Sequence, residues 1–528
     1  MTPAANRYDA IIIGGGHNGL VCAAYLGSAG QRVLVLEAAA APGGAAANVE
    51  FSPGFTVSGC AHILNILDPK VSRDLNLASH GLKLSLPNLK TIALAEDGRH
   101  ITFDGALATN DSLQVYSKTD KANLADLRRL LLRIGKLLKD FYGTVPPRLG
   151  TESWSDRIAL AKLGWAIRRL GRNDMREMLR IAGCNIADVL NDELESDLLK
   201  GAIGFDAVLG TELGPRSPNS VFSLLHRLTG EANGIPGALA LPEGGMGAVT
   251  RAMAAAAEAA GADIRTGSPV ARILVENDRA MGVALETGEV IHADIVVSNA
   301  DPKTTYLKLL GPQYLDTGFV RRVKNIRTRG TAAKLHLALD GLPEFTGLDA
   351  KELGQRLLIA PSLDYVERAF NHCKYGEYST APAIEMIIPT VNDAALAPQG
   401  KHILSAVVQY APYELKGGWE NARDEFIDTA IKTISAYAPG LEGRIIAREL
   451  LTPRDIEEKY RMPGGHWHHG ELALDQLYMM RPVPGAAQYA APLPGLYTCG
   501  AGGHPGGGVM GIAGKNAADR ILKDGKSR

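Results

Sequence analysis

Residues 8–20 read YDAIIIGGGHNGL, and this stretch decides the fold. Its three isoleucines are β-branched residues that suit a buried parallel strand, and the glycines after them begin a turn into the apolar run LVCAAYL. In the resulting GxGxxG motif, Gly14 permits a tight turn, Gly16 lets the backbone approach a pyrophosphate, and Gly19 lets a helix pack closely on the strand. The pattern predicts a dinucleotide at the N-terminus of that helix, which attracts phosphates.

A second strand strengthens the prediction of a Rossmann-type domain. The run QRVLVLE ends in Glu37, which lies 23 residues after Gly14. That spacing is close to the roughly 20 residues expected for a carboxylate that binds a ribose. A second close approach of the backbone follows at a glycine pair. The further residues that we expect to contact the nucleotide are His17, Asn18, Gly43 and Gly44.

Length and composition limit the class of protein. At 528 residues the chain exceeds the roughly 250 to 300 at which single cores stop growing, so we expect two domains. Lys and Arg number 56 against 57 Asp and Glu, a balance that gives no general attraction to nucleic acid. The five cysteines contain no CxxC pair, which argues against a disulfide framework or a cysteine zinc site. With no leader-like segment and no long apolar run, the sequence favours a cytoplasmic protein.

The chain leaves the Rossmann pattern twice. A short hairpin at 51–58, a meander at 82–104 and a mostly helical region at 118–230 come before the run LPEGGMGAV, which begins a glycine turn and an Ala-rich helix. Three short strands follow, VARILVE, MGVALET and EVIHA, and then DIVVSNAD, which resembles a separate buried parallel strand. We therefore expect an α/β protein with two interleaved domains. They are a discontinuous nucleotide domain of residues 1–78, 240–302 and 485–528, and a mixed-sheet substrate domain with a helical cap, of residues 79–239 and 303–484.

One segment of the helical region is strongly basic. Residues 157–180 carry Arg and Lys at seven positions among Leu, Ile and Trp. Such an amphipathic pattern is typical of a helix that lies on a membrane surface, and it also fits a solvated helix face, which is more common. Both interpretations stay open. If the segment is a membrane-surface helix, we expect a cytoplasmic protein with peripheral membrane contact.

The C-terminus favours a flavin over a nicotinamide. The run GLYTCGAGGHPGGGVMGIAGKNAADRIL has nine glycines in residues 495–514, and a nicotinamide dehydrogenase would have no use for this second glycine-rich segment. Backbone N–H groups at 506–510, just before the last helix, can face the flavin edge where reduction builds negative charge. A glycine-rich packing corner is the alternative. A disulfide reductase would show paired cysteines and a second GxGxxG, and neither is present. We predict FAD as the cofactor.

Several motifs together resemble a known family. IIIGGGHNGL, LEAAAAPGGAA, LPEGGMGAV, IVVSNADP, APQGKHILSAVVQYAPY, PGGHWHHGELALDQ and HPGGGVMGIAGKNAA are similar to the glutathione-reductase-type flavoproteins of the phytoene-desaturase and amine-oxidase superfamily. The likeness is greatest to the phytoene-dehydrogenase-related branch, which includes proteins named for a pyridine nucleotide-disulphide oxidoreductase domain. It implies that Gly14, Gly16, Gly19 and Glu37 hold the phosphates and ribose of FAD. The other FAD contacts that it implies are Val270 for the adenine, and Gly500, Gly507, Gly508, Val509 and Met510 for the flavin segment.

The motif PGGHWHHGELALDQ concentrates candidate acid–base groups. We expect His469 and Glu471 to orient the substrate or take up a proton, and a polar loop that merely shapes the pocket is the equal alternative. The spacing differs from the HExxH of helical zinc sites, so we expect no metal. His504, in the glycine-rich C-terminal run, is a further catalytic candidate that can also serve only to brace the turn.

The run TAAKLHLAL supplies the last catalytic candidate. Strand alternation places Lys334 and His336 on one face and the leucines on the other. Lys334 either points into a substrate cavity, where burial would lower its pKa and make it a useful base, or lies with His336 on a solvated face, which we favour. His62 is interpreted as structural, and Cys60 and Cys499 as buried, inert thiols.

The sequence thus predicts an FAD-dependent oxidoreductase that removes hydride from a largely apolar small molecule, in the manner of the desaturases it resembles. A flavin amine oxidase is the first alternative. A flavin-bound protein whose main role is to engage a partner is the second. The expected electron acceptor is oxygen or a quinone, and no nucleic-acid partner is expected.

Overall fold

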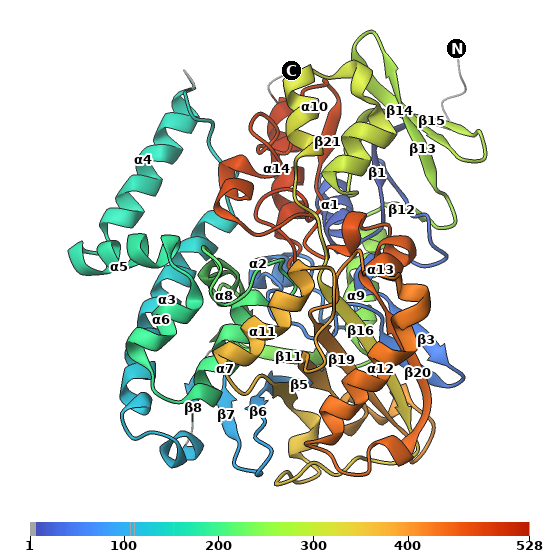
Figure 1. The fold of residues 1–528 in the computed structure, drawn as a ribbon. Helices are drawn as coiled ribbons and strands as arrows, with labels where there is room; N and C mark the ends of the chain where they lie inside the picture. Colours follow the sequence, from blue (N-terminus) through green and yellow to red (C-terminus); the bar gives the residue numbers. More distant parts are fainter. Residues whose placement is uncertain (1–6, 106, 110, 151–152, 527–528) are drawn as a thin grey trace.

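The structure is a computed structural model that describes residues 7–526 apart from 106, 110, 151 and 152. Its upper part, in the view of Figure 1, is built on a seven-stranded sheet with the strand order β12-β2-β1-β15-β14-β13, where β21 also pairs with β15. Pairing is parallel between β12, β2, β1, β15 and β21, and antiparallel from β15 through β14 to β13. These strands are β1 (Arg7–Ile13), β2 (Val33–Leu36), β12 (Asp263–Arg265), β13 (Val270–Glu276), β14 (Arg279–Leu285), β15 (Val290–Ser298) and β21 (Leu496–Thr498).

The isoleucines of β1 are buried because both faces of this sheet are covered. Ile12 packs into a core with α1 (His17–Ser28), α9 (Met246–Ala259) and α14 (Ile512–Lys526), and Ile11 packs into a second core on the other face. That second core includes the π-helix Thr304–Leu310 and α10 (Thr317–Lys324). The sheet is therefore assembled from three stretches of chain, 7–36, 263–298 and 496–498.

One strand prediction is wrong. The runs EVIHA and DIVVSNAD, expected as two separate strands, form the single strand β15. Its first half pairs with β14 in antiparallel fashion, and its length from His292 to Ser298 pairs with β1 in parallel. The exposed Asp294, which looks like a break between two apolar runs, stays within the strand and forms an ion pair with Arg7.

The lower part is an eight-stranded sheet with the order β20-β16-β19-β18-β17-β6-β7-β8 (Figure 1). The predicted meander is confirmed in the antiparallel pair β6 and β7, although the strand before them, β5, pairs with β11 in a separate ribbon. Helix α12 (Trp419–Ser435) covers one face of the sheet, and α7 and α11 cover the other. The strands are β6 (Thr91–Ala93), β7 (Ile101–Asp104), β8 (Ala108–Thr109), β16 (Ala332–Leu339), β17 (Arg356–Ile359), β18 (Ala383–Ile387), β19 (His402–Gln409) and β20 (Ile445–Leu451).

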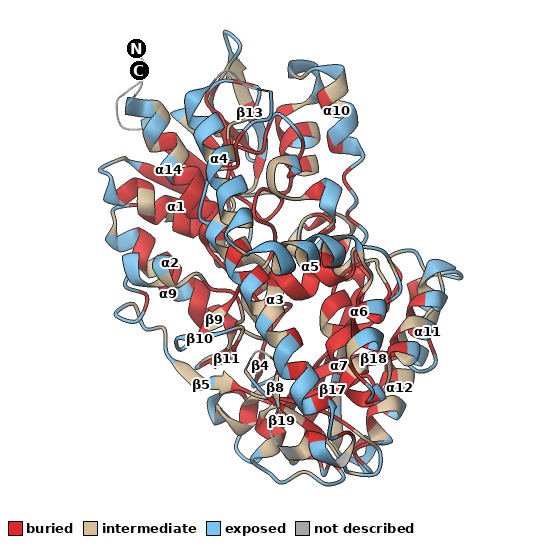
Figure 2. Ribbon diagram, turned by 90° about the vertical axis from the view of Figure 1, so that its left-hand side faces the viewer, coloured by how far each residue is buried: buried red, intermediate tan, exposed pale blue. Residues whose placement is uncertain are grey.

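The helical region is confirmed, and two of its helices stand away from the body. Figure 1 shows α4 and α5 projecting to one side, and Figure 2 shows that most of their surface is exposed. The helices of this region are α3 (Asp120–Tyr142), α4 (Trp154–Arg168), α5 (Arg172–Gly183), α6 (Ile186–Glu193), α7 (Asp197–Val208) and α8 (Val221–Arg227). Within the described part of the chain, no helix combines the length and the apolar character needed to cross a bilayer.

Shorter elements complete the fold. The predicted hairpin at 51–58 is confirmed as the antiparallel pair β3 and β4. The remaining elements are α2 (Pro69–Asp74), α11 (Leu363–Lys374), α13 (Pro453–Tyr460), β3 (Asn48–Ser52), β4 (Phe55–Ser58), β5 (Leu84–Leu89), β9 (Glu231–Ala232), β10 (Ile235–Pro236) and β11 (Leu239–Pro242).

Candidate functional site

A long cavity runs along the glycine turn between β1 and α1, and we call it the glycine-turn cavity. It extends from Val270 at the start of β13, past Glu37 at the end of β2, to Trp467 and His469. Most of the residues that the sequence assigned to a dinucleotide line it. They are Gly14, Gly16, His17, Asn18, Glu37, Gly43, Gly44 and Val270.

The local geometry of the turn explains its glycines. Gly14 has a φ of +96°, a conformation that L side chains rarely adopt. A Cβ on Gly16 would lie 2.8 Å from the Asn299 side chain, and a Cβ on Gly19 would lie 2.3 Å from the carbonyl oxygen of Gly14. Gly19 therefore serves the contact between helix and turn, whereas Gly16 keeps the floor of the cavity open.

Glu37 is fixed beside the turn by the backbone. Its two carboxylate oxygens accept the N–H groups of Gly15 at 2.7 Å and Ala39 at 2.8 Å. A carboxylate offers about four acceptor positions, so lone pairs remain for a ligand's hydroxyl groups. The carboxylate is thereby oriented before any ligand arrives.

Buried polar atoms without partners test whether a dinucleotide fits this cavity. Among the described residues, no group bonds to Nε2 of His17, to either amide atom of Asn18 or to Nδ1 of His469, and all three residues line the cavity. Buried polar atoms are normally hydrogen-bonded. The N–H groups at the start of α1 lie at the same place, because Gly16 caps that helix without a side-chain hydrogen bond. This donor and acceptor set fits the phosphates and ribose of a dinucleotide.

A second cavity, which we call the inner pocket, adjoins the first. The two share His17, Ala45 and Trp467 as lining residues, so a long ligand in the glycine-turn cavity reaches the inner pocket at that point. Gly508 and Val509, from the glycine-rich C-terminal run, also line it. Its apolar walls come from β19, from the end of α7 and from the loops near residues 46–66 and 472, namely Val407, Leu209, Ala46, Ala61, Ile63, Ile66 and Leu472.

Three of the residues predicted to bind the flavin line neither cavity. They are Gly500, Gly507 and Met510. A Cβ on Gly500 would lie 2.4 Å from the carbonyl oxygen of Asn299, and one on Gly507 would lie 2.4 Å from Cα of His468. The Gly507 carbonyl oxygen is 2.8 Å from Nε2 of His226. Met510 is buried, and its carbonyl accepts the N–H of Asp68. These residues hold neighbouring segments together.

The two leading catalytic candidates occupy different places. His469 lines the glycine-turn cavity with a φ of +54°, and burial lowers its pKa. Glu471 is buried, accepts the N–H of Glu212 at 3.0 Å and lies 3.4 Å from Nε2 of His466. The contacts of Glu471 are thus with a neighbouring loop, and the lining of neither cavity includes it.

His504 braces the C-terminal turn. Its Nε2 lies 3.2 Å from the carbonyl oxygen of Phe141, and its own carbonyl accepts the hydroxyl of Tyr489. The edges of two tyrosine rings, Tyr142 and Tyr478, pack against it. Burial lowers the pKa of His504 to about 3, so the imidazole is neutral at physiological pH.

A buried arginine that the sequence analysis missed connects the loops of the site. Arg481 donates to the carbonyls of His468, Gly470, Glu471 and Gln476 on one loop, and to those of Ala501 and Gly503 on the other. Burial lowers its pKa to about 10. One feature of the sequence could have indicated this buried role: Arg481 is the single charged residue in the stretch 476–514.

The expectation of a solvated face for Lys334 and His336 is wrong. Lys334 is 1% exposed and His336 is fully buried, because the face of β16 that carries them is covered by Phe51 of the β3–β4 hairpin and by the segment around His62. Nζ of Lys334 is 2.5 Å from Nδ1 of His62, which itself lines the inner pocket. Burial lowers the pKa of Lys334 to about 7, and burial together with the lysine charge lowers that of His62 to about 4.

Lys334 begins a continuous set of buried charged groups, which we call the charge cluster. Nε2 of His62 is 2.9 Å from Glu385, and Arg356 is 2.5 Å from Glu385 on one side and 2.5 Å from Asp206 on the other. Burial acts to raise the pKa of Glu385, but Arg356 and His62 hold it well below its usual range. The members of the cluster are Lys334, His62, Glu385, Arg356, Asp206 and Arg227, whose Nη2 lies 3.4 Å from Asp206.

The cysteines match their interpretation as inert thiols. Cys60 and Cys499 are buried, and burial raises the pKa of Cys60 to about 11. All five cysteines are free. Among the residues that the structure describes, no three His, Cys, Asp or Glu side chains are grouped so that they can hold a metal ion.

Comparison with known proteins identifies the family. The family described as flavin containing amine oxidoreductase matches residues 19–522. The chain belongs to this family. It is accordingly a member of a flavin-containing oxidoreductase family, and its glycine turn and C-terminal glycine run lie within or beside the matched region.

Relatives of this flavin oxidoreductase span nearly its whole length. Pyridine nucleotide-disulfide oxidoreductase domain-containing protein 2 of Mus musculus is 37% identical over 553 residues, covering 99% of this chain and 94% of the relative. A limonene dehydrogenase component of Castellaniella defragrans is 26% identical, with 98% and 94% covered. The neurosporene-forming phytoene desaturase of Cereibacter sphaeroides is 26% identical, with 97% and 94% covered.

Solved structures share the fold of this flavin oxidoreductase. An oxidoreductase from Methanosarcina mazei superimposes with a TM-score of 0.61 at 18% identity, covering 97% of this chain and 99% of that one. Putrescine oxidase bound to putrescine gives a TM-score of 0.59 at 16% identity, with 99% of both chains covered. These likenesses confirm the α/β fold class with a Rossmann-type domain interleaved with a mixed-sheet domain.

Proposed function

We propose that this protein is an FAD-dependent oxidoreductase that removes hydride from a largely apolar small molecule. The observation that carries the proposal is the junction of the two cavities at His17, Ala45 and Trp467. A dinucleotide anchored at Glu37 and the glycine turn would end where the inner pocket begins. FAD, when bound, supplies the hydride acceptor.

The chain's own residues would divide the remaining tasks. His17, Asn18 and His469 offer the polar atoms that face the cofactor. The apolar walls of the inner pocket exclude water and hold a hydrocarbon portion of the substrate. Lys334 can take or release a proton at Nζ, because burial lowers its pKa to about 7, and it acts through His62, whose Nδ1 lies beside it and whose ring lines the pocket. Glu471 and His504 serve as positioning residues for the surrounding loops.

Two observations favour dehydrogenation of an apolar substrate over amine oxidation. Relatives are named as a limonene dehydrogenase component and as phytoene desaturases. In addition, Trp467 is the single Phe, Tyr or Trp among the described residues that line the inner pocket, whereas an amine site is expected to have an aromatic cage. The amine alternative draws support from the family description and from the fold of putrescine oxidase.

Anaerobic flavin bleaching tests the proposal. The purified holoprotein would be mixed with a panel of terpenoid hydrocarbons, apolar alcohols and acids, and amines, and loss of the oxidised flavin spectrum followed. We expect bleaching by an apolar substrate, and reoxidation of the reduced flavin by oxygen or by a soluble quinone identifies the acceptor. Bleaching by amines alone would establish the amine alternative. A flavin that none of the panel reduces, in a protein that co-purifies with a stable partner, would favour the partner-binding role.

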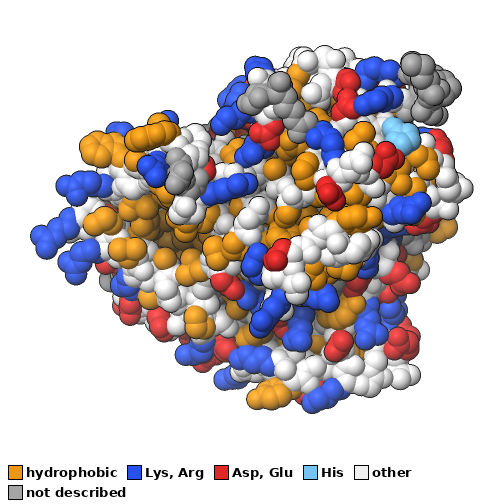
Figure 3. All heavy atoms as spheres, turned by 90° about the horizontal axis from the view of Figure 1, so that it is seen from above, with side chains coloured by type: hydrophobic (Ala, Val, Ile, Leu, Met, Phe, Trp, Pro, Cys, Tyr) orange, Lys and Arg blue, Asp and Glu red, His pale blue; other side chains and the backbone are white. Residues whose placement is uncertain are grey.

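We also propose that the surface of α4 and α5 meets an anionic membrane. Trp154 and Trp165 of α4 are 74% and 63% exposed, and no residue of α4 is buried. Residues 157–180 carry seven basic side chains against two acidic ones. Figure 3 shows hydrophobic side chains around a hollow on this side of the molecule, with Lys and Arg at its outer rim. Exposed tryptophans beside a positive surface are typical of helices that bind in the lipid interface.

A further inference from the structure

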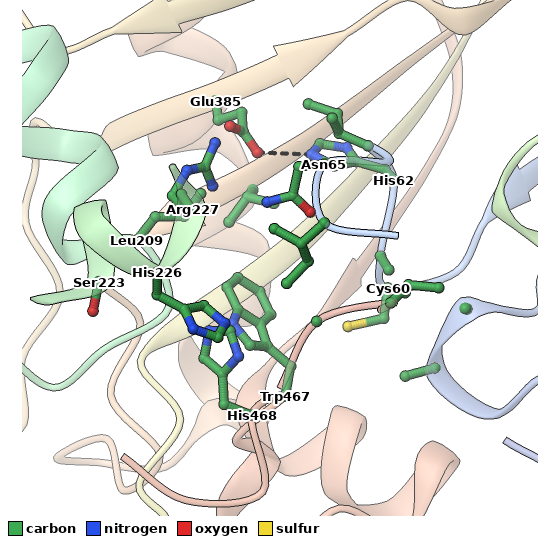
Figure 4. Close-up of a pocket in the computed structure, with 18 of the residues that line it drawn as sticks. Cys60, His62, Asn65, Leu209, Ser223, His226, Arg227, Glu385, Trp467 and His468 are labelled. Atoms are coloured by element: carbon green, nitrogen blue, oxygen red, sulfur yellow. Dashed lines mark hydrogen bonds and ion pairs between the residues drawn. The ribbon is translucent and has the colours of Figure 1, made fainter. Parts of the chain in front are cut away.

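The inner pocket is polar at one end. Figure 4 shows Arg227, Asn65, His62 and Glu385 gathered there, while Trp467 and its histidine neighbours lie at the opposite end. The glycine-turn cavity, where we propose that FAD binds, meets the inner pocket at Trp467. The polar end is therefore the part of the inner pocket that is far from the proposed flavin position. A molecule that lies with its apolar portion at the flavin would extend its other end toward Arg227.

Arg227 is the lining group with spare hydrogen-bonding capacity. Among the described residues its one ion-pair partner is Asp206, at 3.4 Å, and Asp206 is also engaged by two nitrogens of Arg356. Arg227 borders a small neighbouring cavity too, but Asp206 is again the one acidic side chain among the described residues that line it. A guanidinium has five N–H donors, and one shared carboxylate cannot engage all of them, so Arg227 retains donors for an incoming group.

Glu385, unlike Arg227, already has a partner for each of its charged oxygens. One of its carboxylate oxygens is bonded to His62 and the other to Arg356. Its negative charge is therefore already matched inside the protein. The pocket offers an incoming group a cation that is incompletely paired and an anion that is paired on both oxygens.

The two arginines of the charge cluster share an acidic partner, because Arg227 and Arg356 both contact Asp206. The basic members of the cluster are Arg227, Arg356 and Lys334, and its acidic members are Glu385 and Asp206. His62 is neutral at physiological pH because its pKa is lowered to about 4. Buried charges are costly unless they are paired. A negative group in the pocket would give Arg227 an ion-pair partner that it does not share with Arg356.

We propose that the polar end of the inner pocket binds an anionic head group, a carboxylate or a phosphate, of the apolar molecule that the protein oxidises. Arg227 forms the ion pair, and the amide of Asn65 beside it donates a further hydrogen bond. This inference rests on the proposed function, because it assigns a chemical class to the substrate of the same pocket. A pure hydrocarbon would leave Arg227 with Asp206, which it shares with Arg356, as its ion-pair partner among the described residues, and an ammonium group would meet it with like charge.

Binding of head-group probes to the holoprotein tests the inference. Octanoate, octyl phosphate, octylamine and octanol share one chain length, and isothermal titration calorimetry below their micelle-forming concentrations gives each affinity. We expect one or both anions to bind more tightly than octanol, and octylamine to bind more weakly. The better of the two anions distinguishes a carboxylate site from a phosphate site. The inference is overturned if neither anion binds measurably, if octanol equals both anions, or if octylamine binds most tightly.

Variants locate the effect at Arg227. Arg227→Met keeps the apolar stem and should weaken the preferred anion by at least about 30-fold while leaving octanol unchanged. Arg227→Lys should lose less, because it retains the charge. The control is Arg216→Met, at an exposed arginine paired with Asp364. Equal anion affinity in wild type and Arg227→Met, with both proteins folded by thermal melting, would overturn the assignment.

Failure of the inference and failure of the proposed function give different results. The flavin spectrum is recorded before each titration, and a protein that never binds FAD removes the proposed function. If the holoprotein is yellow, is reduced by a neutral hydrocarbon and does not bind the anionic probes, only the head-group inference is overturned.

Discussion

Arg481 shows how much one side chain can organise at this site. Its guanidinium supplies donors to two loops, one carrying His468 and Gly470 and the other carrying Ala501 and Gly503. Because these carbonyls are buried, removal of the donors leaves them without partners. The geometry of the flavin end of the site therefore depends on a residue that lines neither cavity.

We expect Arg481→Met to lower the free energy of unfolding by roughly 3 kcal/mol or more, since it leaves several buried carbonyls unpaired. Arg481→Lys should recover part of the loss, because an ammonium retains three donors. Chemical denaturation measures the stability, and the fraction of FAD retained after gel filtration measures the site. The exposed Arg321 provides the matched control. A stable, fully FAD-loaded Arg481→Met protein would contradict the role assigned to this residue.

Lys334 should make stability depend on pH. Its pKa is lowered to about 7 in the folded protein by burial, against about 10.4 in an unfolded chain. Between these values the unfolded chain holds a proton that the folded protein has released, so the free energy of unfolding rises with pH by at most about 1.4 kcal/mol per pH unit. Below pH 7 both states hold the proton and this dependence disappears.

Replacement by methionine isolates that contribution. The difference in unfolding free energy between wild type and Lys334→Met should change from pH 7 to pH 10 and stay constant from pH 5 to pH 6.5. The exposed Lys324→Met serves as the control. A difference that is flat across the whole range would show that Lys334 is not the titrating group.

The residues that line the glycine-turn cavity were easier to predict from the sequence than those that line the inner pocket. Gly14, Gly16 and Glu37 belong to a local motif whose spacing is set by one strand, one turn and one helix. Glu385 and Arg227 come together from β18 and the end of α8, and no local pattern connects them. A lone Glu inside the apolar run IEMII is the one signal that the sequence offered for this part of the site.

At the scale of elements, the periodicity of apolar residues predicted which segments form helices and which form strands. The wrong predictions are those that depend on pairing between segments far apart in the chain. The helices of 118–230 and the pair β6 and β7 follow from local pattern. Strand β15 was misread because one strand can pair with antiparallel and parallel neighbours at different edges. The polar face of β16 was misread because the side chains that contact it, Phe51 and His62, come from a much earlier part of the chain.

The pair α4 and α5 yields a prediction of its own. The protein should sediment with vesicles that contain phosphatidylglycerol and not with vesicles of phosphatidylcholine alone, and added salt should weaken the binding. Replacement of both Trp154 and Trp165 by Ala should reduce binding by about tenfold or more, because each buried ring contributes roughly 1.5 to 3 kcal/mol.

Tyr375, at the end of α11, is the matched control for this experiment. It is 69% exposed, so Tyr375→Ala removes an aromatic ring of similar exposure from another surface. Its vesicle binding should equal that of wild type. Equal loss in the control and in the double variant, or equal binding to both kinds of vesicle, would contradict a membrane role for α4 and α5.

At the scale of the whole molecule, FAD should act as a structural ligand as well as a cofactor. The glycine-turn cavity joins segments around Gly14, Val270 and Ala501, which are far apart in the chain. A ligand that binds only the folded state stabilises it by about 2.7 kcal/mol at a concentration 100 times its Kd. Excess FAD should therefore raise the melting temperature of the apoprotein.

Gly16→Val should abolish both that increase and the yellow colour of the purified protein. A Cβ at this position lies 2.8 Å from the Asn299 side chain and projects into the approach of the pyrophosphate. Gly30→Val, at an exposed glycine with no heavy atom within 4 Å of an added Cβ, controls for a general effect on folding, although its φ of +83° adds backbone strain. Acid release of FAD from Gly16→Val in a one-to-one ratio would contradict the assigned site.

The assembly of the seven-stranded sheet from three stretches sets the order of events during biosynthesis. Strand β21 and helix α14, which pack against β15 and α1, are synthesised long after the GxGxxG turn. The contact is close, since a Cβ on Gly514 of α14 would lie 2.1 Å from the carbonyl oxygen of Asn18. A nascent chain that stops before residue 496 therefore carries an intact GxGxxG motif without the strand and the helix that complete its sheet, and the edge of β15 that pairs with β21 is left open.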